Sequence, residues 1–153
     1  MRYAEHTGVS SEKSKAEIER LLSKYGAEQF VSGWDAHSAK IGFRLYERHV
    51  RFTLPLPAKD DPRFSKTPSG RKVLRPERAW KAWEQATRQR WRALALVVKA
   101  KLEAVESKIT TFDDEFMSFI VLPNGKTVGE MALPAIETAY KSGKMPPTMI
   151  AGW

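Results

Sequence analysis

The sequence contains no cysteine and only three histidines among its 153 residues. The absence of cysteine excludes a disulfide framework, a thiolate zinc site, an iron–sulfur cluster and a cysteine nucleophile. It is typical of a protein in a reducing compartment. The histidines, His6, His37 and His49, are scattered, and no two of them have the spacing of metal ligands. We therefore expect no metal and no cofactor.

Long apolar segments are also missing. The longest apolar run, residues 93–98, is far too short to span a bilayer. Residues 1–9 are polar and lack the apolar core of a signal peptide. We expect a cytoplasmic protein with no membrane partner. A chain of this length can bury a sizeable core without disulfides, and we see no clean boundary in it, so residues 1–153 are expected to form a single domain.

Motifs of the common enzyme classes are absent as well. The sequence has neither an HExxH nor a GxSxG motif. Gly125-Lys126-Thr127 resembles the end of a phosphate-binding P-loop, but Ile120 stands where that motif requires glycine. The acidic clusters at 60–61 and 113–115 are the only candidates for the converging carboxylates of a metal nuclease. The second cluster also suits the first turn of a helix. We expect that the protein is not an enzyme.

Positive charge is abundant and clustered. The net charge is +8 and the isoelectric point is about 9.8, close to values that are typical of nucleic-acid-binding domains. A long helix is predicted over residues 76–107, and at 3.6 residues per turn its basic side chains fall on one stripe. This basic stripe contains Arg78, Lys81, Gln85, Arg88, Arg92 and Lys99. Only Glu77 and Glu84 are acidic between residues 71 and 101, so a polyanion is the expected partner, with DNA preferred over RNA.

The same helix carries a second, apolar stripe. It includes Trp80, Trp83, Trp91, Leu94 and Val98. Indole rings can stack on bases, but at helical spacing beside leucine and valine they are more typical of a core. We expect these tryptophans to pack under a sheet.

Alternating apolar residues predict a three-stranded antiparallel meander over residues 28–57. The alternation is clearest in the second and third strands, at Ile41, Phe43 and Leu45 and then at Val50, Phe52 and Leu54. A tight turn at Glu47-Arg48 would place Leu45 opposite Val50 and Arg44 opposite Arg51.

The whole pattern indicates an α+β fold. A helix at residues 10–26 precedes the sheet, and a basic, proline-rich loop at 58–75 follows it. The long amphipathic basic helix is expected to pack on the sheet, and residues 111–153 form the C-terminal helices and tail. Capping boxes are predicted at Thr111 with Asp114 and at Thr127 with Glu130, and Pro134 is expected to kink or restart the last helix.

The polar face of the predicted sheet is basic and carries one aromatic ring. Cations on such a face can follow the phosphates of a single strand while Tyr46 stacks a base. The alternative is a solvated outer face on which cations prevent edge pairing, but the basic helix and loop favour binding. The expected nucleic-acid-binding residues are Lys40, Arg44, Tyr46 and Arg51 in the sheet, Arg71 and Lys72 in the loop, and Arg78, Lys81, Arg88 and Arg92 in the long helix.

Residues 25–145 resemble a set of small uncharacterised proteins encoded by phages and prophages. The resemblance is carried by IGFR at 41–44, RFTLPLP at 51–57, KAWEQ at 81–85 with RWRAL at 90–94, and VLPNGKTVGE at 121–130. It implies a phage context but no particular activity. Separately, the order of elements over residues 12–107 is similar to that in the core of Rad52-type and phage single-strand annealing proteins, an order that many α+β domains share.

These observations lead to the expectation of a non-enzymatic protein of phage origin that binds single-stranded DNA, in recombination or replication. The alternative is an inhibitor or adaptor whose basic surface binds an acidic host protein, because a cationic stripe complements any anionic surface. The short first strand and the apolar tail at 145–153 predict a homo-oligomer. A monomer whose C-terminal helices cover its own sheet edges is the other possibility.

Overall fold

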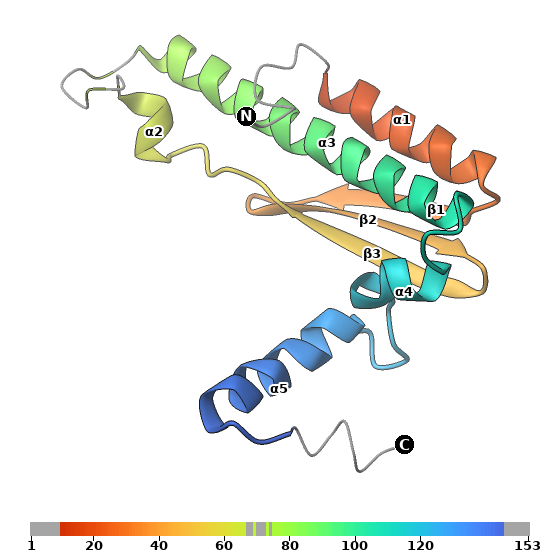
Figure 1. Cartoon of the computed structure of the whole chain (residues 1–153). Helices are drawn as coiled ribbons and strands as arrows, with labels where there is room; N and C mark the ends of the chain where they lie inside the picture. The colour runs from red at the N-terminus through yellow and green to blue at the C-terminus, as the bar shows by residue number, and fades with distance from the viewer. Residues whose placement is uncertain (1–9, 67–68, 70–72, 74, 146–153) are drawn as a thin grey trace.

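The computed structural model describes residues 10–66, 69, 73 and 75–145, and it has the α+β fold that the sequence predicts (Figure 1). A three-stranded antiparallel sheet in the order β1-β2-β3 lies between an N-terminal helix and a long helix in the chain. The elements are α1 (Ser11–Lys24), β1 (Glu28–Trp34), β2 (Ser38–Leu45), β3 (Arg48–Pro55), α2 (Pro62–Ser65), α3 (Pro76–Glu106), α4 (Phe112–Phe116), the 3₁₀ turn η1 (Met117–Phe119) and α5 (Val128–Ser142). None of these helices is both long enough and apolar enough to cross a membrane.

Local signals in the sequence begin and end the helices. The hydroxyl of Ser10 caps α1, and Thr127 and Glu130 form the predicted reciprocal capping box at the start of α5. Gly143, in the left-handed conformation with φ 70°, ends α5. Pro134, which was expected to kink or restart this helix, lies inside a continuous α5.

The core lies on one face of the sheet. Figure 1 shows α1 and α3 side by side across this face, with α4 near the β2–β3 turn. The core side chains are Ile18 and Leu22 from α1; Ala39, Ile41, Phe43 and Leu45 from β2; Val50 and Phe52 from β3; Trp91, Leu94, Ala95, Val98 and Leu102 from α3; and Phe112 and Phe116 from α4. Since side chains alternate along a strand, the polar residues of β2 and β3 point to the opposite face.

The β2–β3 hairpin differs from the predicted register by two residues. The predicted turn at Glu47-Arg48, with Arg44 opposite Arg51, is wrong. The turn is instead Tyr46-Glu47, with φ of 48° and 63°, and two positive φ angles are the geometry of a type I′ loop. Arg51 therefore pairs with Gly42. Because the shift is by two residues, every strand side chain keeps its predicted face.

The tryptophans at the start of α3 do not pack under the sheet as predicted. Trp91 is 4% exposed, but Trp80 is 47% exposed and Trp83 is half-buried. The reason is length. With 31 residues, α3 is about 46 Å long at 1.5 Å per residue, whereas the eight residues of β2 span only about 26 Å. The first turns of α3 therefore extend past the sheet (Figure 1).

The segment predicted as a basic loop, residues 58–75, contains a short helix. The carboxylate of Asp61 caps α2 by accepting the backbone N–H of Arg63 at 2.9 Å. Helix α2 packs on α3, and Phe64 is buried there. Arg71 and Lys72, which were expected to close over a bound strand, lie outside the described residues.

Helix α5 packs on η1 and otherwise extends away from the sheet (Figure 1). It contains no buried residue. Its close contact with η1 depends on Gly129, where an added Cβ would lie 2.9 Å from the carbonyl oxygen of Ser118. Leu133, Ile136 and Tyr140, at helical spacing, are all exposed. The exposed apolar side chains of α5 are thus not covered by any other residue that the structure describes.

The strained turn gives a test of the hairpin geometry. We predict that Glu47→Gly stabilises the protein by about 1 kcal/mol relative to Glu47→Ala, because glycine removes a left-handed penalty of about 1–2 kcal/mol but costs backbone entropy in the unfolded chain. Both variants lose the same carboxylate, so the difference reports the backbone. Urea denaturation of the two variants measures it. Equal midpoints would show that residue 47 does not have a positive φ.

Candidate nucleic-acid interface

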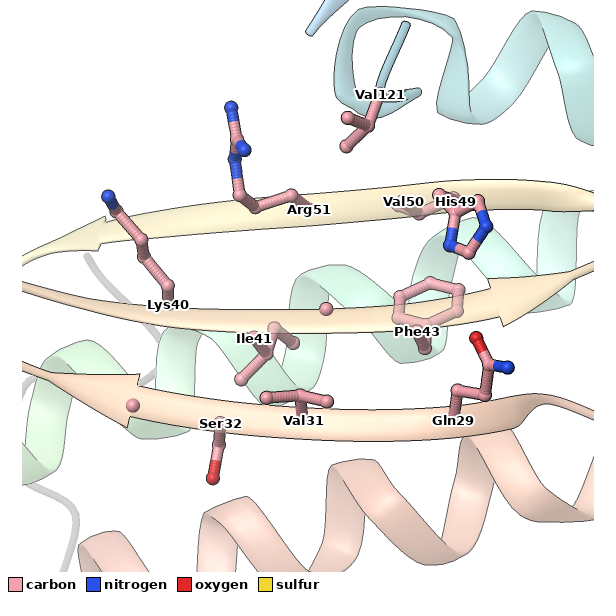
Figure 2. Close-up of a pocket in the computed structure, with 12 residues that line it drawn as sticks. Gln29, Val31, Ser32, Lys40, Ile41, Phe43, His49, Val50, Arg51 and Val121 are labelled. Atoms are coloured by element: carbon pink, nitrogen blue, oxygen red, sulfur yellow. The ribbon is translucent and has the colours of Figure 1, made fainter. Parts of the chain in front are cut away.

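The open face of the sheet carries a hollow of about 470 Å³. Figure 2 shows Lys40 reaching from β2 and Arg51 and His49 from β3, on the side of the sheet away from α1 and α3. Arg44, on β2, belongs to the same face because it pairs with His49. Three basic side chains from two neighbouring strands therefore line one concave surface, and Arg44 lies on the same face of the sheet.

Two glycines make the floor of this hollow. Gly33 of β1 pairs with Lys40, and Gly42 of β2 lies between Val31 and Arg51. Neither glycine needs its conformational freedom here, since neither has a positive φ. Because these two glycines have no side chain, the sheet backbone is left uncovered between the basic residues and beside the exposed Val31.

The cations of this face have different electrostatic partners. Lys40 is exposed and forms no ion pair within the part of the chain that the structure describes. Arg44 lies 3.7 Å from the carboxylate of Glu28, and both are partly exposed. Arg51 donates to the carbonyl oxygen of Gly125 at 3.0 Å and to Glu130 at 3.2 Å. The rim thus combines one unpaired ammonium with two guanidinium groups that are each fixed in position by an acid.

Glu130 links this face to α5. Its pKa lies below the usual range because the backbone N–H of Thr127 donates to its carboxylate and because the guanidinium of Arg51 lies beside it. The carboxylate therefore stays ionised at neutral pH and holds Arg51 at the edge of β3 where α5 begins. Coulomb attraction between such exposed groups is weak, so a phosphate could compete for Arg51.

The basic stripe of α3 lies on the other side of the sheet. The apolar stripe of α3 packs on the core face, so no part of this helix reaches the hollow. The structure thus separates the predicted binding residues into two surfaces. A strand bound on the open face would not contact both at once.

Acidic partners occupy the middle of the basic stripe. Arg92 forms a short ion pair with Glu17 of α1, and Arg88 contacts Glu84 at 4.0 Å and donates to Gln85. Counting the acids within α3 alone missed Glu17, which reaches Arg92 because α1 packs alongside. Nearer the start of α3, Arg78 and Lys81 are exposed and form no ion pair with any described residue.

Tyr46 does not lie on the open face. It occupies the β2–β3 turn, and its ring contacts Phe112 edge-to-face with centroids 5.1 Å apart. The ring is 59% exposed, but it is directed toward α4. The prediction that Tyr46 stacks a base beside Arg44 and Arg51 therefore lacks support from its position.

A cavity lined by tryptophans was missed by the sequence analysis. It has a volume of about 770 Å³ and lies where the first turns of α3 pass the sheet. Its aromatic lining consists of Trp34, Trp80, Trp83 and Trp91. One feature of the sequence pointed to this cavity, namely an apolar stripe on a helix that is longer than the strands. Trp34, however, comes from the end of β1, which is far from α3 in the sequence.

The two acidic clusters have structural roles. Asp61 accepts from the guanidinium of Arg63, which lowers the pKa of this carboxyl group, and Asp113 forms an ion pair with Arg48 at 3.2 Å. Among the described residues, no three histidine, aspartate or glutamate side chains gather as a metal site requires.

Comparison with protein-family models, with curated proteins and with solved structures gives no match for this chain.

The Arg92–Glu17 ion pair between α1 and α3 predicts which basic residues of α3 can be replaced without loss of stability. Arg92→Glu should destabilise the fold by about 1 kcal/mol, because it places two carboxylates together at a partly buried contact. Lys99→Glu makes the same change of charge at an exposed site without an ion pair in the described chain, and it should leave stability nearly unchanged. Thermal unfolding of both variants tests this, and equal midpoints would argue against the Arg92–Glu17 contact.

Proposed function

We propose that the protein is a non-enzymatic, single-strand nucleic-acid-binding protein of phage origin that acts in the cytoplasm of a bacterial host. The observation that carries the proposal is the open, hollow sheet face with Lys40, Arg44, His49 and Arg51 around it. The phage context comes from the sequence resemblance, and the preference for DNA, in recombination or replication, is the expectation stated from the sequence.

A single strand fits this face better than a duplex. The three strands of the sheet are about 10 Å across, at roughly 4.8 Å between neighbours, and the basic side chains come from the two strands β2 and β3. A groove of this kind follows one phosphate backbone. The floor at Gly33 and Gly42 gives the backbone or a sugar room to approach closely.

Binding should depend on salt and on Lys40. With about three phosphate contacts at roughly −0.7 each on a single strand, the slope of log affinity against log salt should be about −2. Lys40→Glu should weaken binding of a labelled oligothymidylate at least tenfold, because it places a carboxylate beside the phosphates. Fluorescence anisotropy at several salt concentrations measures both quantities.

Lys99→Glu is the matched control, since it makes the same charge change on α3, on the other side of the sheet. It should lower affinity much less than Lys40→Glu. No binding at low salt would refute the proposal. Equal losses in the two variants would show that only net charge matters and that the open face is not the site.

A second candidate function is an adaptor or inhibitor that binds a host protein. It is favoured by the exposed apolar residues of α5, Leu133, Ile136 and Tyr140, because exposed apolar patches are typical of protein interfaces. A pull-down from host lysate, repeated after nuclease treatment, separates the two functions. A partner that survives nuclease and is lost in Leu133→Glu supports the adaptor; a partner lost with the nucleic acid supports the first proposal.

A further inference from the structure

The tryptophan-lined cavity has the size and position of a ligand site. Its volume of about 770 Å³ lies within the usual range of about 300–1,000 Å³ for small-molecule sites. Four segments that are far apart in the sequence meet there: the start of α1, the β1–β2 turn, residues 56–60 and the first half of α3. Two of its indole rings, those of Trp34 and Trp80, are exposed to solvent.

Hydrogen bonds hold two of the indoles in place. Trp83 donates its Nε1–H to the carbonyl oxygen of Pro57 at 2.8 Å, and Trp80 donates to Glu84 at 2.7 Å. Their rings lie 5.1 Å apart at a tilt of 37°. Trp34, in contrast, is 78% exposed. An indole this exposed at the mouth of an aromatic cavity is a surface for stacking a planar ring.

The cavity also carries a cation suited to an anionic group. The Nζ atom of Lys59 lies 4.9 Å from the ring of Trp80 and 4.8 Å from that of Trp83, and it has no ion pair among the residues described. Three acids line the cavity: Asp35 accepts two backbone N–H groups of its own turn, Glu12 lies 3.8 Å from Lys15, and Asp60 is exposed. None of these acids forms an ion pair with Lys59 in the part of the chain that the structure describes, so its ammonium is the cation that a phosphate in the cavity would contact.

The cavity adjoins the open sheet face. Gly33 lines the basic hollow beside Lys40, and the next residue, Trp34, lines the cavity. The β1–β2 hairpin is thus the shared boundary of the two sites. Because side chains alternate along β1, Gly33 faces the hollow while Trp34, which pairs with Ala39, faces the helix side of the sheet. A strand that follows the hollow past Lys40 therefore reaches the exposed ring of Trp34 by passing around the β1–β2 end of the sheet.

We infer that the tryptophan-lined cavity binds one nucleobase together with its phosphate, with the base stacked on Trp34 and the phosphate on Lys59. This inference deepens the proposed function and depends on it for a strand as the source of the nucleotide. A free nucleotide carries the same chemistry, so the experiment compares both sources. A ligand cation is disfavoured because the ammonium of Lys59 already occupies the faces of two indoles.

The test uses the intrinsic fluorescence of the full chain. Oligothymidylate, thymidine monophosphate and choline are each titrated into the wild type and into Trp34→Ala, Lys59→Gln and Tyr140→Ala. Tyr140→Ala is the matched control, because it removes an 88% exposed ring from α5. We expect quenching by the oligonucleotide and, at higher concentration, by the mononucleotide, with none by choline. Trp34→Ala should lower oligonucleotide affinity by about 5- to 150-fold, while Tyr140→Ala should not change it.

The outcomes separate this inference from the proposed function. If anisotropy shows oligonucleotide binding but Trp34→Ala binds like Tyr140→Ala and no quenching occurs, the cavity inference is overturned and the proposed function stands. If only the mononucleotide quenches, and does so in a Trp34- and Lys59-dependent way, the cavity is supported and the strand-binding function is refuted. Quenching by choline alone overturns the inference. Because Trp34 is so exposed, Trp34→Ala should unfold at the wild-type temperature, which thermal denaturation verifies.

Discussion

Burial of one face of a three-stranded sheet is the constraint on which the rest of this structure depends. The apolar positions of β2 and β3 all point to one side, where Trp91, Leu94, Val98 and Leu102 of α3 and the phenylalanines of α4 cover them. Such burial contributes about 25 cal/mol per Å² of apolar surface, or roughly 1.5–3 kcal/mol for one fully buried large side chain, whereas an exposed ion pair contributes about 1 kcal/mol or less. It fixes the position of α3 and leaves the other face of the sheet open.

Both candidate sites follow from that arrangement. A strand alternates, so the same packing that buries Ile41 and Phe43 points Lys40 and Arg44 away from the core. Because α3 is longer than the strands that it covers, its first turns extend beyond them and keep two tryptophans accessible. The β1–β2 hairpin separates the basic hollow on one face of the sheet from the tryptophan-lined cavity on the other, so a cationic surface and an aromatic surface meet at the end of this hairpin. Single-strand nucleic acid needs both kinds of contact.

The sequence predicted what depends on local pattern. The alternation in β2 and β3, the caps at Thr111 and Thr127, and the stop at Gly143 are all present. The register was missed because Tyr46-Glu47 adopts a turn that usually requires asparagine or glycine. The Arg92–Glu17 ion pair could not be read from α3, since its acid comes from another helix. The cavity was missed because Trp34 joins Trp80 and Trp83 only after the chain has folded. Contacts between distant segments are thus the part that pattern alone does not supply.

Nuclear magnetic resonance of the isotope-labelled protein, titrated with oligothymidylate, tests most directly whether the open sheet face and the adjoining cavity form the binding surface. We predict amide shifts at Gly33, Lys40, Gly42 and Arg51 and indole N–H shifts at Trp34 and Trp80, with Lys99 and Lys108 unaffected. These two lysines are exposed and lie apart from both sites. Shifts confined to α3 between Arg88 and Lys99, or to α5, with the sheet amides unchanged, would contradict this assignment.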